Sequence, residues 1–268
     1  MNFKKVYITL LLTLFSISLI HAQQNEQDEL AQKLQNPLAS IIALPIQQNI
    51  GLNKPGHEGA SYTMSFQPII GTEFEKFNLV HRAVWGMSHL PSSTEGRGSQ
   101  FGVTDLNYSF FFSPKKKLGN LAWGIGPSID IPTASHSAMG TEKWSAGASA
   151  VFVYQTKRWT FDMIFRQTAS FAGNSDRHDV NAFVGQTLIA YGLGKGWVVN
   201  TFPTITANWN AESGEKWTVP VGGGINKLVF LGGKLPLNLG LQYYHNVVKP
   251  NHAANGELRF QTTFVFAK

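Results

Sequence analysis

Two long alternating runs, joined by three polar residues, constrain the fold of this chain more than any other feature. They read WSAGASAVFVYQTKRWTFDMIFRQTASF, from Trp144 to Phe171, with the polar turn at residues 156–158. Side chains of a strand point alternately to its two faces, so the pattern predicts a β-hairpin and not a helix. Each run has about a dozen residues against about five or six in an average strand, which suits a tilted membrane crossing of about nine to eleven residues.

Residue type separates cleanly between the two faces of this hairpin. In the first run Trp144, Ala146, Ala148, Ala150, Phe152 and Tyr154 oppose Ser145, Gly147, Ser149 and Gln155. In the second run Trp159, Phe161, Met163 and Phe165 oppose Thr160, Asp162, Arg166, Thr168 and Ser170. A soluble β-sandwich can have the same pattern, so the choice between a membrane barrel and a sandwich depends on the rest of the chain.

The first twenty-two residues have the three-part layout of a secretory signal peptide. Lys4 and Lys5 precede an apolar run over residues 6–20, and Ala22 precedes a polar stretch. The alternative is an N-terminal membrane anchor, but the run is shorter than the roughly twenty apolar residues of a spanning helix. No later stretch is comparably apolar, so a membrane-embedded mature chain would have to be a closed barrel.

Composition agrees with an exported β-protein. Charged residues make up 14% of the chain, against roughly 25% in soluble domains. The net charge of +6 is modest and scattered, so the chain has no basic patch of the kind that binds nucleic acid. There is no cysteine, and therefore no disulfide framework.

The alternation continues along the chain and predicts about twelve strands. They lie near residues 41–51, 60–71, 76–89, 99–113, 119–132, 144–157, 158–172, 180–193, 196–209, 216–231, 233–247 and 255–267. Short and long connections alternate between them, as in an outer-membrane barrel with short periplasmic turns and longer outer loops. The expected organisation is a signal peptide over 1–22, a polar periplasmic leader over 23–40 and an up-and-down antiparallel barrel over 41–268.

Two further patterns belong to this picture. Leu30, Leu34 and Leu38 recur every four residues in the leader, which allows either a short helix docked into the barrel or a loosely ordered segment, the second being favoured. The tryptophans gather near strand ends, as an interfacial girdle requires: Trp85, Trp123, Trp144, Trp159, Trp197, Trp209 and Trp217. The last strand, from Leu258 to Phe266, resembles the C-terminal signal that barrel-assembly machinery reads.

Several segments resemble a known bacterial family. They are LQNPLASIIALPIQQN (34–49), FQPII (66–70), GVTDLNYSFFFSPKK (102–116), LAWGIGPSIDIPTAS (121–135), GTEKWSAGASAVFVYQ (140–155) and WTVPVGGGINKL (217–228). This family of proposed outer-membrane transporters, some members of which are mislabelled neuromedin U, is close to the barrels linked to phenol degradation by the meta-cleavage pathway. The resemblance implies a barrel in the outer membrane of a Gram-negative-type bacterium and the passage of small or hydrophobic molecules. It supplies no catalytic residues.

No enzyme motif stands out in the chain. There is neither a G-x-S-x-G nucleophile elbow nor a phosphate-binding loop, and the glycines at 192–196 and 222–224 suit turns and close packing. Histidines occur in the predicted loops, but no two have the spacing of metal ligands. An outer-membrane hydrolase built from Ser, His and Asp at the rim is a distant alternative, and we expect no cofactor and no metal.

Charges inside the predicted strands are more informative. An Arg or Lys facing lipid near the midplane costs about 2–4 kcal/mol, so these residues should face the lumen: Arg82, Asp105, Asp130, Asp162, Arg166, Glu257 and Arg259. They could line a charged passage or brace a closed barrel. A barrel of about eight strands has a filled interior and one of about sixteen or more has an open channel, and twelve strands lie between these sizes. Similar heights on neighbouring strands also predict a cross-strand ion pair between Arg82 and Asp105.

The sequence thus favours a transporter or narrow porin for small solutes, with outer-membrane lipid and a small-molecule solute as partners. A structural or ligand-binding barrel that transports nothing is the alternative.

Overall fold

The structure, a computed structural model, describes residues 27–39 and 41–266, and strands account for most of them. The strands are β1 (Ile42–Leu52), β2 (Ser61–Phe66), β3 (Ile69–Glu73), β4 (Phe77–Leu90), β5 (Gln100–Val103), β6 (Leu106–Pro114), β7 (Leu121–Ile131), β8 (Lys143–Gln155), β9 (Trp159–Gly173), β10 (Asn181–Gly194), β11 (Trp197–Thr201), β12 (Thr204–Asn208), β13 (Trp217–Leu231), β14 (Leu235–Val248) and β15 (Gly256–Phe266). Three pairs, β2 with β3, β5 with β6 and β11 with β12, are single barrel strands interrupted by a short break.

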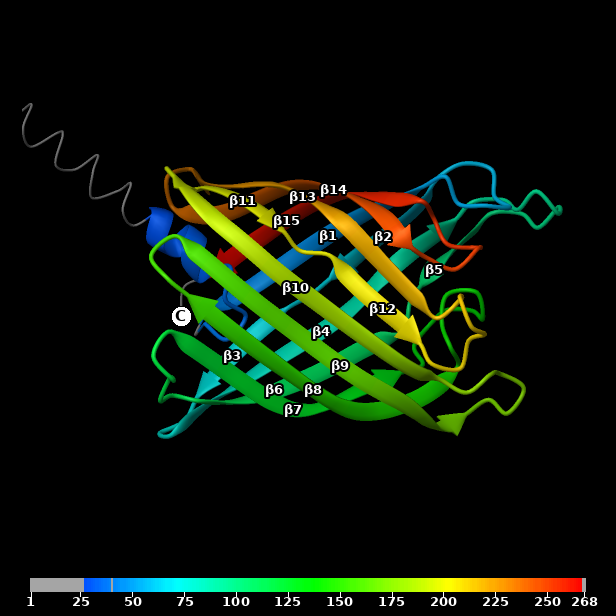
Figure 1. The fold of residues 1–268 in the computed structure, drawn as a ribbon, viewed down its shortest axis with the longest axis horizontal. Coiled ribbons are helices and arrows are strands. Elements are labelled where there is room, and N and C mark those ends of the chain that lie inside the picture. Colours follow the sequence, from blue (N-terminus) through cyan, green and yellow to red (C-terminus); the bar gives the residue numbers. More distant parts are fainter. Residues whose placement is uncertain (1–26, 40, 267–268) are drawn as a thin grey trace, which may run out of the picture.

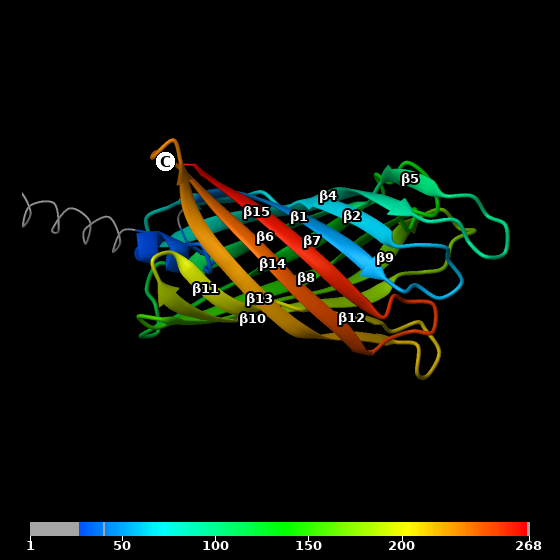
Figure 2. The same ribbon diagram turned by 90° about the horizontal axis from the view of Figure 1, so that it is seen from above.

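The strands close into an antiparallel barrel of twelve (Figure 1). Chain neighbours pair along the sheet, β9 pairs with β10, and β1 pairs with β15, so the described ladder has no open edge. All strands tilt against the long axis of the molecule, as Figure 2 also shows. The predicted fold class, an all-β up-and-down antiparallel barrel, is confirmed.

Proline explains two of the three breaks. Pro68 and Pro203 have no backbone N–H to give to a ladder, and pairing stops beside each of them. At the second break the chain turns toward the lumen, and the backbone N–H of Phe202 donates to the hydroxyl oxygen of Tyr244 at 2.8 Å. The break thus keeps its backbone satisfied by using a side chain from β14, two strands away along the sheet.

The two faces of the central hairpin separate as predicted. Trp144, Phe152 and Phe161 are exposed on the outer surface, whereas Ser145 and Asp162 are buried in the interior. The interior also holds apolar side chains that the prediction left out. Near the short-turn end a buried cluster packs together, formed by Leu38, Val80, Phe111, Ala122, Val151, Val153 and Ile164.

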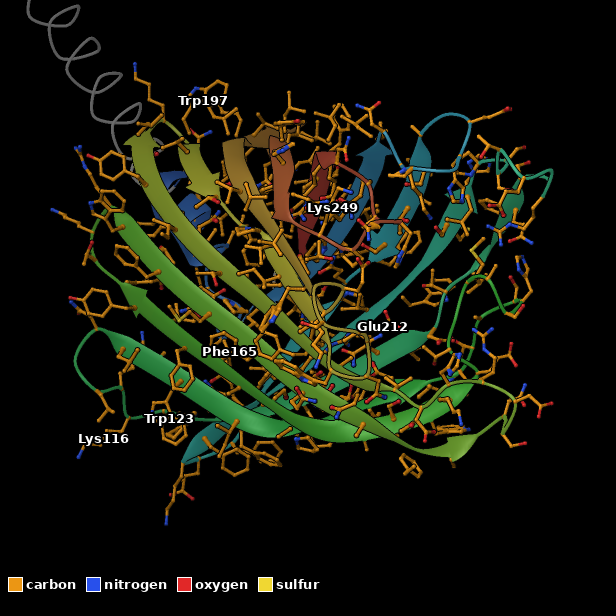
Figure 3. The ribbon with its side chains drawn as sticks, turned by 45° about the vertical axis from the view of Figure 1, so that its right-hand side comes forward. Lys116, Trp123, Phe165, Trp197, Glu212 and Lys249 are labelled. Carbon is orange, nitrogen blue, oxygen red and sulfur yellow. The ribbon has the colours of Figure 1, made fainter. Side chains whose placement is uncertain are left out.

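The two ends of the barrel differ in their connections. One end carries short turns at residues 74–76, 156–158 and 195–196, and the other carries loops that extend well beyond the strands (Figure 1). Figure 3 shows Trp123 and Trp197 toward the short-turn end. Trp85 departs from the strand-end rule, because it lies in the body of β4, where it stacks on Phe66 with ring centroids 5.4 Å apart.

Residues 27–33 form a short helix at the short-turn end, where the sequence favoured a loosely ordered leader (Figure 1). Ala31 is buried in a cluster with Leu188, Ala190, Val198 and Leu228, and Leu30 and Leu34 pack against it. Within the described part of the chain, no helix is both long and apolar enough to cross a bilayer. The predicted signal peptide lies outside the described residues.

Candidate functional site in the barrel lumen

Uncharged polar side chains dominate the interior between the apolar cluster and the loops. Buried members of this set come from nearly every strand: Gln47, Gln67, Asn107, Ser109, Ser128, Ser149, Thr168, Gln186, Asn200, Asn226, Asn238, Gln242 and Thr263. They bond to one another across strands, as in the chain from Gln242 through Asn200 to Asn226, with donor–acceptor distances of 2.8 and 2.9 Å. Sequence reasoning missed this set because amides and hydroxyls suit loops as well as lumens.

Arg82 crosses the lumen. Its Nη2 donates to Gln67 Oε1 and to Gln186 Oε1, both at 2.8 Å. Gln186 lies on β10, which is separated from β4 by β6, β7, β8 and β9 along the sheet. The side chain is 9% exposed and forms no ion pair among the described residues. Arg82 and the two glutamines therefore form a partition across the barrel.

A cavity lies on each side of this partition. The one toward the loops has a volume of about 250 Å³, and Arg82, Arg166, Ser109 and Thr206 are among its lining residues. The one toward the helix measures about 90 Å³ and is capped by residues 34–37. Asp162 faces this smaller cavity, and its Oδ1 has no hydrogen-bond partner in the described protein.

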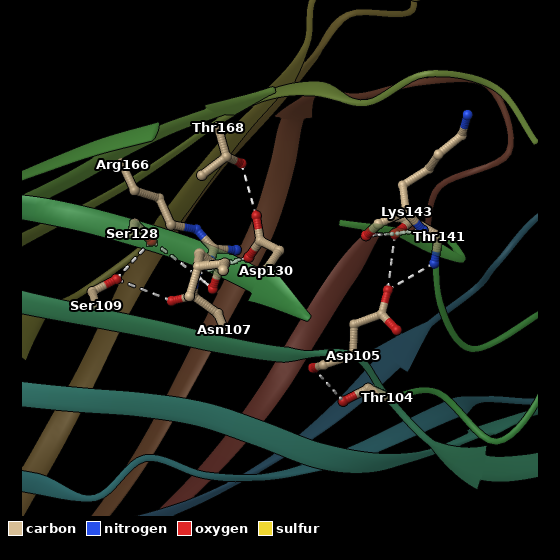
Figure 4. Close-up of polar contacts among 11 residues, drawn as sticks. Thr104, Asp105, Asn107, Ser109, Ser128, Asp130, Thr141, Lys143, Arg166 and Thr168 are labelled. Atoms are coloured by element: carbon tan, nitrogen blue, oxygen red, sulfur yellow. Dashed lines mark hydrogen bonds and ion pairs between the residues drawn. The ribbon is translucent and has the colours of Figure 1, made fainter. Parts of the chain in front are cut away.

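Asp130 and Arg166 belong to one polar cluster on the wall (Figure 4). Arg166 Nη1 lies 3.1 Å from Asp130 Oδ1, and Thr168 donates to Oδ2 of the same carboxylate at 2.8 Å. Asn107 completes the set by donating to Asp130 Oδ1 at 2.8 Å. With both oxygens bonded, Asp130 is fully engaged in bracing β6, β7 and β9.

Asp105 lies at the loop-side rim, between β5 and β6 (Figure 4). Its carboxylate accepts from the backbone N–H of Ala134 at 3.1 Å and from the N–H and hydroxyl of Thr141 at 2.7 and 3.0 Å. The predicted ion pair with Arg82 is therefore wrong. Arg82 is opposite Ser109, which is four residues along the chain from Asp105, so the two backbone positions are offset by roughly 13 Å along the strand direction.

Glu257 and Arg259 form a second brace beside the break at Pro203. Arg259 is 3.0 Å from Glu257 through Nε, donates through Nη1 to the Phe202 carbonyl oxygen at 2.7 Å, and lies over the Tyr244 ring. The inward-bent backbone is thus held from two other strands. All seven predicted charges are now located: Asp105 is at the rim, and Arg82, Asp130, Asp162, Arg166, Glu257 and Arg259 are inside the barrel.

Lys143 and Asp179 connect β8 to the loop before β10. Lys143 Nζ lies 3.0 Å from Asp179 Oδ1, with Lys143 buried and Asp179 on the surface. The hydrogen bond from Lys143, and the positive charge behind it, lower the pKa of the Asp179 carboxyl. This contact holds the loop of residues 174–180 against the barrel.

Residues 27–39 close the opposite mouth through bonds to the short turns. Asn36 Nδ2 donates to Gln155 Oε1 at 3.0 Å, and the Gly196 N–H donates to Asp28 Oδ1 at 2.6 Å. Gly196 has a φ of +73°, and a Cβ there would lie 2.9 Å from the Leu228 carbonyl oxygen. Glycine is required at this turn both by its backbone conformation and by the closeness of the next strand.

No group of three or more potential His, Asp or Glu ligands occurs among residues 27–39 and 41–266. The described lumen offers hydrogen bonding along its length, and two guanidinium groups, those of Arg82 and Arg166, at the larger cavity.

Comparison with known proteins agrees with this architecture. The sequence profile of the family described as "Putative MetA-pathway of phenol degradation" matches residues 51–260. An outer-membrane channel from Pseudomonas putida F1 is similar in structure, with a TM-score of 0.59, 16% identity and coverage of 84% of this chain and 94% of that one. The NanC porin is also similar, with a TM-score of 0.52, 11% identity and coverage of 85% and 100%. At these identities the likeness establishes the fold, and no functionally curated protein matches the chain in sequence.

Proposed function

This chain belongs to the MetA-pathway phenol-degradation family, and from that premise we propose that it is an outer-membrane channel for small solutes. The observation that carries the proposal is a closed barrel with an apolar outer surface and a polar interior that holds a cavity of about 250 Å³. The structurally similar proteins described as an outer-membrane channel and a porin support it.

The outer surface supports a membrane address. Large apolar side chains are exposed there over most of the barrel, including Phe161, Met163, Ile225 and Leu241. In Figure 3 Phe165 lies on the outside of the barrel, midway along the sheet. Such a continuous apolar surface has no stable place in water and is what lipid requires of a barrel.

Lys227 supports a membrane–water interface near the short-turn end of the barrel. It is on the outer face near the short-turn end, with its Nζ 4.8 Å from the centre of the Trp197 ring and bonded to the Lys195 carbonyl oxygen. A lysine that lays its stem along an apolar surface and turns its charge to a tryptophan belt is typical of a membrane interface.

Conductance tests the channel directly. We expect the purified barrel in a planar bilayer to give steady single-channel steps, small because Arg82 and residues 27–39 narrow the path. A protein that inserts, and that still changes gel mobility on boiling, but gives no steps and no solute flux would overturn the proposal.

The alternative function is a barrel that transports nothing and binds or supports something in the membrane. The partition at Arg82 and the docked N-terminal segment favour it, because both obstruct the lumen. A variant that lacks residues 23–39 separates the two functions. A channel should conduct more when the mouth is cleared, and a filled barrel should stay closed.

A further inference from the structure

We propose that the larger lumen cavity is a binding site for a small organic carboxylate with an apolar body, held by Arg82 and Arg166. The inference deepens the proposed function by naming the class of solute, and it rests on that function where the bound molecule is taken to pass through the barrel.

Arg82 is a buried cation with donors to spare. Its two hydrogen bonds both leave from Nη2, and both go to neutral amide oxygens. The N–H groups on Nη1 and Nε have no acceptor in the described protein, although the side chain lines the cavity. A buried guanidinium normally has its fork filled by a carboxylate or similar planar acceptor, whereas Arg82 leaves half of its fork unfilled where it lines the cavity.

Arg166 adds a second guanidinium to the same cavity. Its bond to Asp130 leaves through Nη1 alone, so Nε and Nη2 are also without a protein acceptor among the described residues. Asp130 is not part of the lining, and the lining contains no Asp or Glu at all. Asp130 pairs with Arg166 from outside this lining, and Asp162 attracts Arg82 from the smaller cavity. The two guanidiniums are the only charged side chains in the described lining of the larger cavity, and their unused donors favour an anion there.

The remaining lining residues indicate which other chemical groups the bound anion has. Val84, Phe111, Ile164 and Val184 form an apolar part of the wall, and the remaining lining is mainly amides and hydroxyls with Ser65, Ser109 and Thr204 among them. A bare inorganic anion would leave the apolar wall unused. A carboxylate on a short aliphatic or aromatic body can bind the two guanidinium groups and also pack against the apolar wall. A cavity of about 250 Å³ suits one such molecule.

The test is equilibrium dialysis of the detergent-purified, full-length barrel with three probes: benzoate, benzyl alcohol and acetate. Benzoate has charge and body, benzyl alcohol has the body alone, and acetate has the charge with almost no body. We expect benzoate to bind at least about tenfold more tightly than either of the other two. Equal binding of benzoate and benzyl alcohol, or of benzoate and acetate, would overturn the proposal.

Variants assign the binding to the cavity. Arg82→Gln should weaken benzoate binding at least about tenfold, because one carboxylate contact to a desolvated cation is lost. Arg82→Lys should be intermediate, since it keeps the charge and loses the planar fork. Arg158→Gln, in an exposed turn outside the lumen, is the matched control and should bind as the parent does. Arg82→Gln binding benzoate like this control would contradict the assignment.

Gel mobility before and after boiling shows whether each variant has assembled. If Arg82→Gln does not assemble, Thr206→Glu places a carboxylate in the same lining at a half-buried position. It should abolish benzoate binding and spare benzyl alcohol, and unchanged benzoate affinity would overturn the site. Dialysis does not depend on conduction: binding without conduction removes only the channel, and conduction without binding removes only this site.

Discussion

At the scale of single residues, the hydrogen-bond and ion-pair partners of each charged side chain determine its role in the barrel. Asp130 and Arg259 have their bonding capacity taken up by neighbours on the wall, whereas Arg82 and Arg166 keep free donors toward the cavity. The choice between a charged passage and an internal brace therefore has a different answer for different residues. Asp105 has a third role, as an anchor for a loop.

Asp105 gives a prediction that separates a loop anchor from a passage charge. Asp105→Ala removes the acceptor of three hydrogen bonds from Ala134 and Thr141, so the loop of residues 132–142 should detach. We expect faster cleavage of the folded barrel by added protease in this loop, measured by mass spectrometry, with unchanged ion selectivity. Ser137→Ala in the same loop is the control for the substitution itself. Altered ion selectivity with an unchanged rate of loop cleavage would show that Asp105 acts on permeating ions and not as a loop anchor.

Asp179 gives a pH dependence with a definite sign. Its pKa is lowered by Lys143, so the contribution of this contact is complete above the ordinary pKa near 3.9 and is lost as the pH falls through the lower folded-state value. The carboxyl ¹³C shift of Asp179 should titrate below the range of free aspartate, and Lys143→Met should move the midpoint back up. A midpoint that does not respond to Lys143→Met would show that the lysine does not lower this pKa.

At the scale of elements, the segment of residues 27–39 is the part of the molecule best placed to control access. It has its own buried apolar contacts, and polar bonds to Gln155 at the end of β8 and to the turn at Gly196 hold it in the mouth. The sequence contained the signal, in the leucines at 30, 34 and 38, but a four-residue spacing does not say whether a helix docks or stays free.

Locking this segment tests its role. The chain has no cysteine, so Asn36→Cys with Gln155→Cys creates the sole thiol pair. A short bifunctional thiol reagent should reduce conductance, and a cleavable version should allow recovery on reduction. Gln48→Cys with Gln155→Cys, whose first position is on β1, is a pair control that leaves the segment free. Equal conductance of locked and unlocked protein would show that the segment does not move out of the mouth during conduction.

The strands themselves were predictable and their internal breaks were not. Alternation over a dozen residues is a strong signal, so the predicted hairpin of 144–157 and 158–172 agrees with β8 and β9 within a few residues. The structure has Arg82 in the interior, where it bonds to Gln186. Sequence alone could not place Gln186 beside it, because that contact depends on which strands face one another across the closed ring. The error over Asp105 has a related cause: the stagger between strands is set by pairing, not by counting from strand ends.

At the scale of the whole molecule, the closed ladder makes the barrel one cooperative unit. Each of the twelve barrel strands has two neighbours, so loosening one exposes backbone groups on both sides. We expect unboiled protein in mild detergent to migrate differently from boiled protein on a gel. A chain truncated before Gly256, which lacks β15, should show a single mobility. Heat-sensitive mobility in the truncated chain would mean that the ring closes without this strand.

The pairing of β1 with β15 also determines at what point during folding the barrel can close. Ile42 pairs with Phe266, and the register continues to Leu52 with Gly256, so the seam joins the first strand made to the last. Closing so long a loop is entropically costly and kinetically slow, and no chain that lacks either β1 or β15 can complete it. A newly made chain must therefore wait, with two unpaired strand edges, until β15 is available. During that interval the edges are sites for pairing with other chains. We expect the time a chain spends in this state, more than its final stability, to govern how much of it reaches the membrane correctly folded.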